Sequence, residues 1–208
     1  VWNYPIDVTE KCKKYIKDFD IVTTRELSGV KLCQQFLSTK AYHVLDPTFL
    51  IDKKIYEEIA NSQKNIITQG IYTYILDKNH FKEKIVKETS EHLNLSVFDI
   101  DSNPSVENWI QGFINSDFVI TDSFHGTCFA IIFNKPFIAI LNKDRGNARF
   151  ESLAIMLNIK NRFISEDSDI SNILDQTIDF EEINNIIKQK KEESCNLLNK
   201  VLNGTEKL

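Results

Sequence analysis

Short apolar runs that alternate with amphipathic helical patterns constrain the fold of this chain more than any other feature. The runs are rich in β-branched and aromatic residues, as in Ile71–Leu76 and Phe137–Leu141, which is typical of strands. Segments with apolar residues at helical spacing, such as Phe81–Leu93, lie between them. The repeated strand–helix–strand order with short connections predicts an α/β fold. We expect a doubly wound, mostly parallel, Rossmann-like sheet that is covered by helices on both faces.

This pattern assigns most of the chain to elements. The predicted strands are Asp20–Thr24, Tyr42–Leu45, Ile71–Leu76, Ser96–Ile100, Phe118–Thr121 and Phe137–Leu141. The predicted helices are Glu26–Leu37, Asp52–Ala60, Phe81–Leu93, Ser105–Asn115, Thr127–Phe133 and Phe180–Leu202. We expect one Rossmann-like domain over residues 1–164. The helical segment over 165–208 is expected to pack on this domain or on a further one.

Composition excludes several classes of function. The net charge of −5 and the pI near 5.5 argue against a binder of duplex nucleic acid, which would usually be basic. No apolar run reaches the roughly 18 residues that a membrane-spanning helix needs. The four cysteines form no CxxC pair and no cluster with histidine, so we predict no metal site and a reduced, cytoplasmic setting. Because the chain begins at Val1 and not at Met, we expect it to be the second half of a longer protein.

The information about chemistry is concentrated in residues 116–150. The predicted strand Phe118–Thr121 runs into a polar turn, with Asp122 as the candidate N-cap of the helix that follows. Ligands of open α/β sheets bind beyond the carboxyl ends of the strands, and the N–H groups at a helix start favour anions. Gly126 would let a ligand approach the backbone closely. His125 would lie at the mouth of this site, where it could transfer a proton.

Arginine is rare in this chain and is therefore informative. Lys and Arg together number 25, but only four of these are Arg. Arg25 follows the first predicted strand and opens a helix, a position that is unfavourable for a cation unless an anion lies nearby. Arg145 and Arg149 follow the strand Phe137–Leu141 and would reach the same edge of the sheet. We expect these guanidinium groups to hold the anion.

Several pieces of the chain, in order and at matching spacing, resemble the polysaccharide pyruvyl transferase family. The pieces are Thr24–Ser28, Leu45–Leu50, Asp117–Gly126, Asn134–Phe137, and Arg145 with Arg149. The resemblance implies a glycosyltransferase-B-like architecture with its active site between two domains, of which this chain would be the C-terminal, donor-binding half. It implies transfer of a pyruvyl group from phosphoenolpyruvate to a sugar of a surface polysaccharide, which forms a ketal. It also implies a saccharide acceptor, free or lipid-linked, no cofactor, and a location in the cytoplasm or at the inner face of the membrane.

The resemblance carries over to individual residues. Arg25 matches a donor-binding arginine, and His125 matches the motif histidine, which is expected to be the catalytic acid or base. The neighbouring Phe124, Gly126 and Thr127 complete the predicted donor site. Many family members have Arg where this chain has Ser123, so we expect Ser123 to donate a hydroxyl while Arg145 or Arg149 supplies the charge.

Two other functions stay open at this point. The strand–turn–helix pattern is also similar to the nucleotide-sugar half of glycosyltransferase-B enzymes, although no acidic residue is placed to bind a ribose. A non-catalytic binding module on the same fold is the second alternative, which Ser123 favours. A purely structural interpretation also stays open. In that interpretation His125 is a core histidine, and the arginines are ordinary surface cations, namely Arg25, Arg145 and Arg149.

Overall fold

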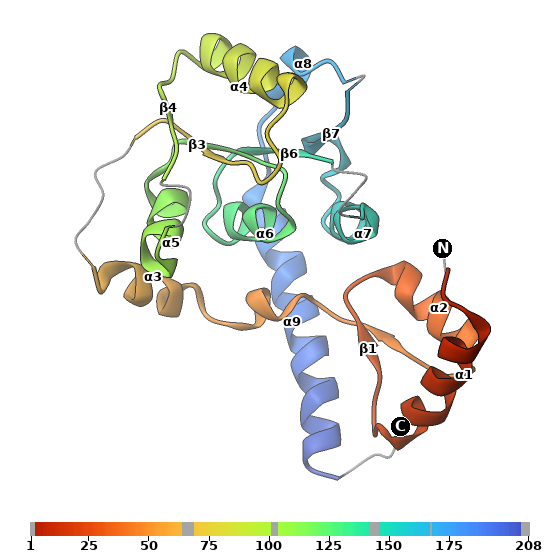
Figure 1. The fold of residues 1–208 in the computed structure, drawn as a ribbon. Helices are drawn as coiled ribbons and strands as arrows, with labels where there is room; N and C mark the ends of the chain where they lie inside the picture. The colour runs from red at the N-terminus through yellow and green to blue at the C-terminus, as the bar shows by residue number, and fades with distance from the viewer. Residues whose placement is uncertain (1–2, 64–68, 101–103, 142–145, 167, 205–208) are drawn as a thin grey trace.

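The computed structural model describes residues 3–63, 69–100, 104–141, 146–166 and 168–204, and its centre is a five-stranded parallel sheet (Figure 1). The strands are β3 (Ile71–Tyr74), β4 (Val97–Phe98), β5 (Phe118–Thr121), β6 (Phe137–Ile140) and β7 (Phe163–Ile164). Their order across the sheet is β4-β3-β5-β6-β7, and every pairing is parallel. This is a doubly wound order with its topological switch point between β3 and β5. The predicted α/β class is confirmed.

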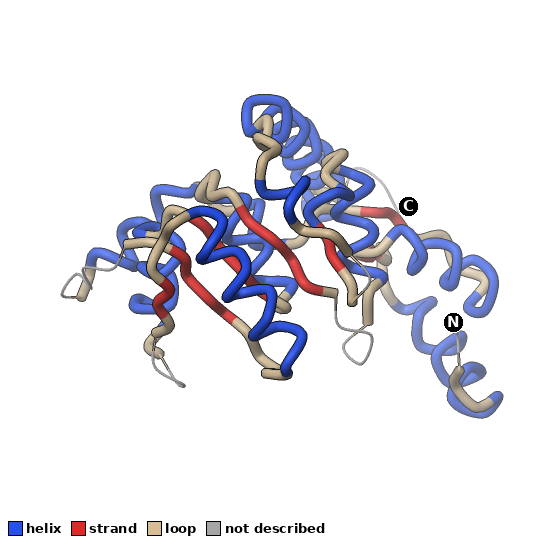
Figure 2. The backbone as a smooth tube through the Cα atoms, turned by 90° about the horizontal axis from the view of Figure 1, so that it is seen from above, coloured by secondary structure: helices blue, strands red, loops and turns tan. Residues whose placement is uncertain are grey.

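Helices cover both faces of this sheet (Figures 1 and 2). The helices α4 (His80–Leu93) and α8 (Ser171–Leu174) cover one face. The other face is covered by α3 (Lys53–Asn61), α5 (Val106–Asn115), α6 (Phe124–Ile132), α7 (Ala148–Met156) and part of α9 (Phe180–Leu202). Residues of one strand alternate between the two faces. Ile71 packs in the core under α4 and α8, and Tyr72 packs in the core on the opposite face.

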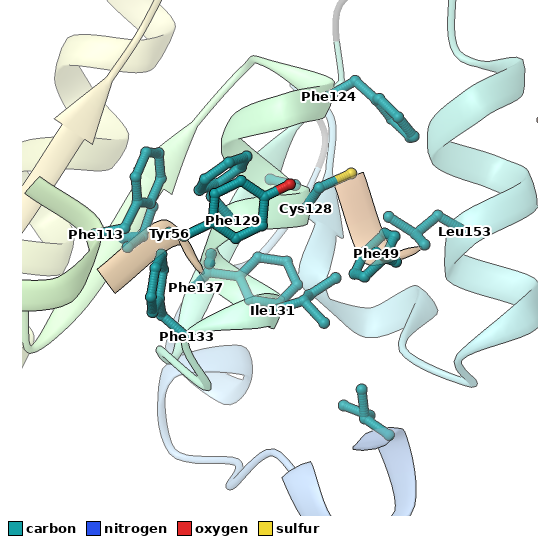
Figure 3. Packing of buried hydrophobic residues seen from close by; sticks show 14 of the residues in the cluster. Phe49, Tyr56, Phe113, Phe124, Cys128, Phe129, Ile131, Phe133, Phe137 and Leu153 are labelled. Carbon is teal, nitrogen blue, oxygen red and sulfur yellow. The ribbon is translucent and has the colours of Figure 1, made fainter. Parts of the chain in front are cut away.

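The larger core lies between the sheet and α6, and it is rich in aromatic rings (Figure 3). Phe113, Phe129 and Phe133 pack around one another, and the ring of Tyr56 meets that of Phe129 edge-on at a centroid distance of 4.8 Å. Helix α6 is apolar on nearly all sides, because it lies between the sheet and the outer elements. Its backbone is therefore held firmly, and the first turn of α6 has a defined position.

The first two strands do not join this sheet. β1 (Thr23–Thr24) and β2 (Tyr42–His43) pair only with each other, in parallel, as a separate two-stranded sheet. The prediction of a single sheet over residues 1–164 is wrong for them. Their crossover helix α2 (Leu27–Leu37) and the preceding α1 (Ile6–Tyr15) enclose a small apolar cluster around Cys33, Leu37 and Ala41. The local pattern predicted strands correctly but contained no information about their partners.

Two contacts fix this small N-terminal unit against the rest of the molecule. The backbone N–H of Leu27, at the start of α2, donates to Ser152 Oγ of α7 at 3.0 Å. The backbone N–H of Leu45 donates to Ser194 Oγ of α9 at 3.2 Å. Helix α9 thus extends from the large sheet to the small one (Figure 1).

The remaining elements connect these parts. They are the 3-10 helices η1 (Ile16–Asp18), η2 (Pro47–Leu50) and η4 (Lys160–Arg162). Sequence reasoning predicted β5 and α9 with their observed bounds. It missed α1, α7, α8 and β7, which are short or lack a clear apolar period. Within the described part of the chain, none of the helices has both the length and the apolar content to cross a membrane.

Candidate functional site

The candidate site lies at the carboxyl edge of the large sheet, next to its switch point. β3 ends at Tyr74 and β5 ends at Thr121, and these two strands are neighbours. Helix α6 starts two residues after β5, with Ser123 as its N-cap. Ser123 Oγ accepts a hydrogen bond from the N–H of Gly126 at 3.3 Å. The first turn of α6 therefore points its N–H groups toward the place where ligands of such sheets bind.

Asp122 does not cap α6, which corrects the prediction. Its buried carboxylate accepts hydrogen bonds from the N–H groups of Leu76 and Asp77, at 2.7 and 3.1 Å. It also pairs with Lys82 Nζ at 2.6 Å. Asp122 thus ties the end of β5 to the loop after β3, and it supports the turn from which α6 begins.

Gly126 and Thr127 are packed toward the interior of the protein rather than toward the open edge. A Cβ atom at Gly126 would lie 2.4 Å from Thr121 Oγ1 and 3.1 Å from Tyr74 Cδ1, so a glycine is needed for close packing of α6 on the sheet. Thr127 is fully buried, and its hydroxyl donates to the carbonyl of Ser123 at 3.1 Å. Contact of Gly126 and Thr127 with a donor stays a prediction, and it would have to be made by their backbone atoms.

His125 meets an acidic and a basic residue from the small N-terminal unit. The His125 side chain is 49% exposed, and its Nε2 lies 3.9 Å from Asp46 Oδ2. The same Oδ2 accepts a hydrogen bond from Arg25 Nη1 at 2.5 Å. Arg25 follows β1, Asp46 follows β2, and His125 belongs to α6. Residues that are 100 positions apart in the sequence thus meet at one point.

Phe124 provides a surface for two guanidinium groups. The Cζ atom of Arg25 lies 5.7 Å from the centroid of the Phe124 ring, and that of Arg149 lies 5.2 Å from it. Guanidinium groups are attracted to the face of an aromatic ring at such distances. Arg149 comes from the first turn of α7. The structure therefore brings together Arg25, Phe124, His125 and Arg149 of the predicted site residues, whereas Arg145 lies outside the described residues.

Sequence reasoning missed Asp46, which is the most deeply buried charged residue of this cluster. Its side chain is only 3% exposed. Burial alone would raise its pKa, but hydrogen bonds from the N–H and hydroxyl of Thr48 and the contact with Arg25 outweigh burial. The pKa of Asp46 therefore lies below its ordinary value, and the group is ionised at neutral pH. In the sequence, the pair Asp46–Pro47 occurs within Leu45–Leu50, one of the pieces that carry the family resemblance.

The cluster contains groups that can bind an anion. Arg25 pairs with Asp46, and the guanidinium group of Arg149 lies over the same Phe124 ring as that of Arg25. On the far side of Arg25 a cavity of about 250 Å³ extends between the small sheet and α9. Its lining is mostly apolar, with Leu45, Leu50 and Leu197 among its residues, so an anion would bind on the His125 side. Across the described ranges, no group of three or more His, Cys, Asp or Glu residues could hold a metal ion.

Comparison with known proteins gives one finding about the family. The family model described as polysaccharide pyruvyl transferase matches residues 5–144, about two thirds of the chain. The match contains Arg25, Asp46 and the whole turn from Asp122 to Thr127, while Arg149 lies beyond it. No curated protein matches the chain.

Proposed function

Because this chain belongs to the polysaccharide pyruvyl transferase family, we propose that it binds phosphoenolpyruvate and takes part in forming a pyruvyl ketal on a saccharide. The observation that carries the proposal is the arrangement around the Phe124 ring, which has the His125 ring beside it and the guanidinium groups of Arg25 and Arg149 near it. A proton donor next to a cation pair is what an anionic enol donor requires.

In this proposal the cations hold the donor. Phosphoenolpyruvate carries a carboxylate and a phosphate, and arginine binds both kinds of group through paired N–H donors. Arg25 and Arg149 lie close enough to one ring to act on a single small molecule. Ser123 Oγ accepts the N–H of Gly126 in the helix cap, and its hydroxyl hydrogen can still be donated to the ligand. The N–H groups of that helix start add a further attraction for the anion.

His125 then transfers the protons. The protonated imidazole gives a proton to C3 of the enol, and the first saccharide hydroxyl adds to C2 while its proton returns to the imidazole. The C2–O bond to phosphate breaks, and the second hydroxyl closes the ketal as its proton leaves with the phosphate. One donor and one diol thus give one ketal and one inorganic phosphate. The exposed position of His125 supports this role, since the ring must reach both reactants.

An amide-shift NMR titration of the chain tests donor binding. Phosphoenolpyruvate should cause saturable shifts at Arg25, at Ser123–Thr127 and at Arg149, and Arg25→Lys should weaken its binding more than tenfold, because a point charge does not replace a bidentate fork. UDP-glucose and inorganic phosphate serve as comparison ligands. Shifts at these residues with UDP-glucose alone would favour a nucleotide-sugar enzyme. The absence of shifts with all three ligands would count against a donor site in this chain.

Turnover is tested by phosphorus NMR of phosphate release with simple hexosides as acceptors. His125→Ala should lower the rate at least a hundredfold, the usual range for a general acid, and change donor affinity little. His92→Ala is the matched control, because His92 lies near the C-terminal end of α4 and pairs there with Asp175. Release at an undiminished rate by the His125 variant would remove this residue from the chemistry.

A further inference from the structure

We propose that Asp46 is the positioning residue of His125: it accepts the Nε2 hydrogen of the imidazole and leaves Nδ1 to face the donor. This inference rests on the proposed function for its chemical meaning. Its geometric basis is the 3.9 Å separation between His125 Nε2 and Asp46 Oδ2. Catalytic hydrogen bonds are often long before the ligand binds and tighten in the complex. A movement of about 1 Å by the exposed ring would bring the pair to hydrogen-bond distance.

The carboxylate is held so that one oxygen is directed to this task. Oδ1 accepts both the N–H and the hydroxyl of Thr48, at 3.0 and 2.8 Å. The carbonyl of Thr48 in turn accepts the hydroxyl of Tyr56 at 3.0 Å. Oδ2 accepts Arg25 and still has a lone pair, because an ionised carboxylate can accept about four hydrogen bonds. The remaining capacity of Asp46 therefore lies on the side of His125.

The burial of Asp46 excludes a direct role as the base for the saccharide. Only 3% of its side chain is exposed, whereas 49% of His125 is exposed. A reactant can therefore touch the imidazole but not the carboxylate. Asp46 acts through His125, in the way that a buried carboxylate orients an imidazole and stabilises its charged form. It stays ionised throughout.

Other groups around the pair limit how strongly Asp46 acts on the imidazole. Arg25 and Arg149 are cations of the same cluster, and Arg25 binds the carboxylate oxygen of Asp46 that lies nearest to His125. The hydroxyl of Tyr56 and the thiol of Cys128 face Asp46, and burial raises the pKa of both, so both are neutral. Among the described residues, Asp46 is the carboxylate that lies against His125, at 3.9 Å, and we expect removal of its charge to change the reactivity of the imidazole severalfold.

The first test measures the ring itself and needs no enzymatic activity. Diethyl pyrocarbonate acylates only the uncharged imidazole, and the rate at each histidine is followed by mass spectrometry of the full chain. At pH 6, Asp46→Asn should make His125 react at least threefold faster, and the two rates should converge at pH 8.5. Asp52→Asn is the matched control, because Asp52 also accepts the N–H two residues ahead of it but lies at the start of α3.

Two results would overturn the inference. Equal rates for His125 in the Asp46→Asn variant and the native chain at pH 6 would mean that the carboxylate does not act on the ring. A faster reaction at both pH values would mean that the substitution only exposes the ring. Asp46→Glu keeps the charge and should restore a rate at pH 6 closer to the native one, which separates the loss of charge from the loss of shape.

The second test is a double-mutant cycle with phosphoenolpyruvate and an acceptor. Asp46→Asn should lower kcat at least thirtyfold in the native chain but less than threefold in the His125→Ala background, because its effect passes through the histidine. The change in donor affinity, which passes through Arg25, should be the same in both backgrounds. Equal losses of kcat in both backgrounds would contradict the inference. If the native chain does not turn over, the proposed function fails, and the acylation rates alone decide the role of Asp46.

Discussion

At the residue scale, Asp46 links the stability of the protein to its site. It is a buried carboxylate whose hydrogen bonds and contact with Arg25 outweigh the effect of burial, so that its pKa lies below the ordinary value. A group of this kind binds its proton more readily in the unfolded chain than in the folded one. It therefore stabilises the fold at pH values above its unfolded pKa, and this contribution disappears as the pH falls through its folded pKa.

This gives a prediction for acid unfolding. Between about pH 5 and pH 3, the free energy of unfolding of the native chain should fall more steeply than that of Asp46→Asn, because asparagine has no proton to bind. Urea unfolding at a series of pH values measures the difference. A difference between the two chains that stays constant over this range would mean that Asp46 titrates alike in the folded and unfolded states.

At the element scale, a buried ion pair connects α4 to the end of β5. Lys82 and Asp122 have side chains that are 5% and 0% exposed, and Lys82 Nζ also donates to the carbonyl of Asp77 at 2.6 Å. Asp122 directly precedes Ser123, the N-cap of α6. The pair thus helps to position the helix start that carries His125, although neither partner lies in the charge cluster around Phe124.

Breaking this pair on one side should be costly. Lys82→Met leaves the Asp122 carboxylate buried with only backbone donors, and the loss should be about 3–5 kcal/mol in the free energy of unfolding. Lys84→Met is the matched control on the same helix, because Lys84 is exposed and its pair with Glu88 spans 3.6 Å. Its effect should stay within about 0.5 kcal/mol. Equal effects of the two substitutions in chemical denaturation would show that the buried pair is not a special contact.

At the scale of the whole molecule, α9 connects the two sheets. Ile183 near its start is 2% exposed in the core of the large sheet, and Ser194 near its end lies against the small sheet. Arg25 and Asp46 follow the two strands of the small sheet, and His125 lies in α6, which packs on the large sheet. The candidate site therefore depends on how firmly these parts are held together.

The contact between Ser194 and Leu45 tests this dependence. Ser194→Ala removes the acceptor of a buried N–H group, which should cost about 1–3 kcal/mol and speed up hydrogen exchange at the Leu45 amide. Asn196→Ala, which changes an exposed residue of the same helix, should leave that exchange rate unchanged. If the Leu45 amide exchanges alike in both variants, α9 does not hold the small sheet.

The local sequence determined much of the fold. Helix α9 and strand β5 lie where the apolar periods predicted them, because each period reports burial of a single element. The turn before α6 and the importance of His125 and Arg25 were also accessible, since strand, polar turn and helix follow directly along the chain. The glycosyltransferase-B-like architecture and the division at residue 164 remain predictions.

Only the tertiary structure decided which residues meet. The sequence placed Arg25 and His125 at strand ends, but it contained no signal that Asp46 lies between them or that Phe124 faces both Arg25 and Arg149. It also did not separate β1 and β2 from the large sheet. The physical reason is that periodicity, caps and turns are local properties. The pairing of strands and the meeting of charges depend on contacts between segments that are up to about 100 residues apart, which no local pattern encodes.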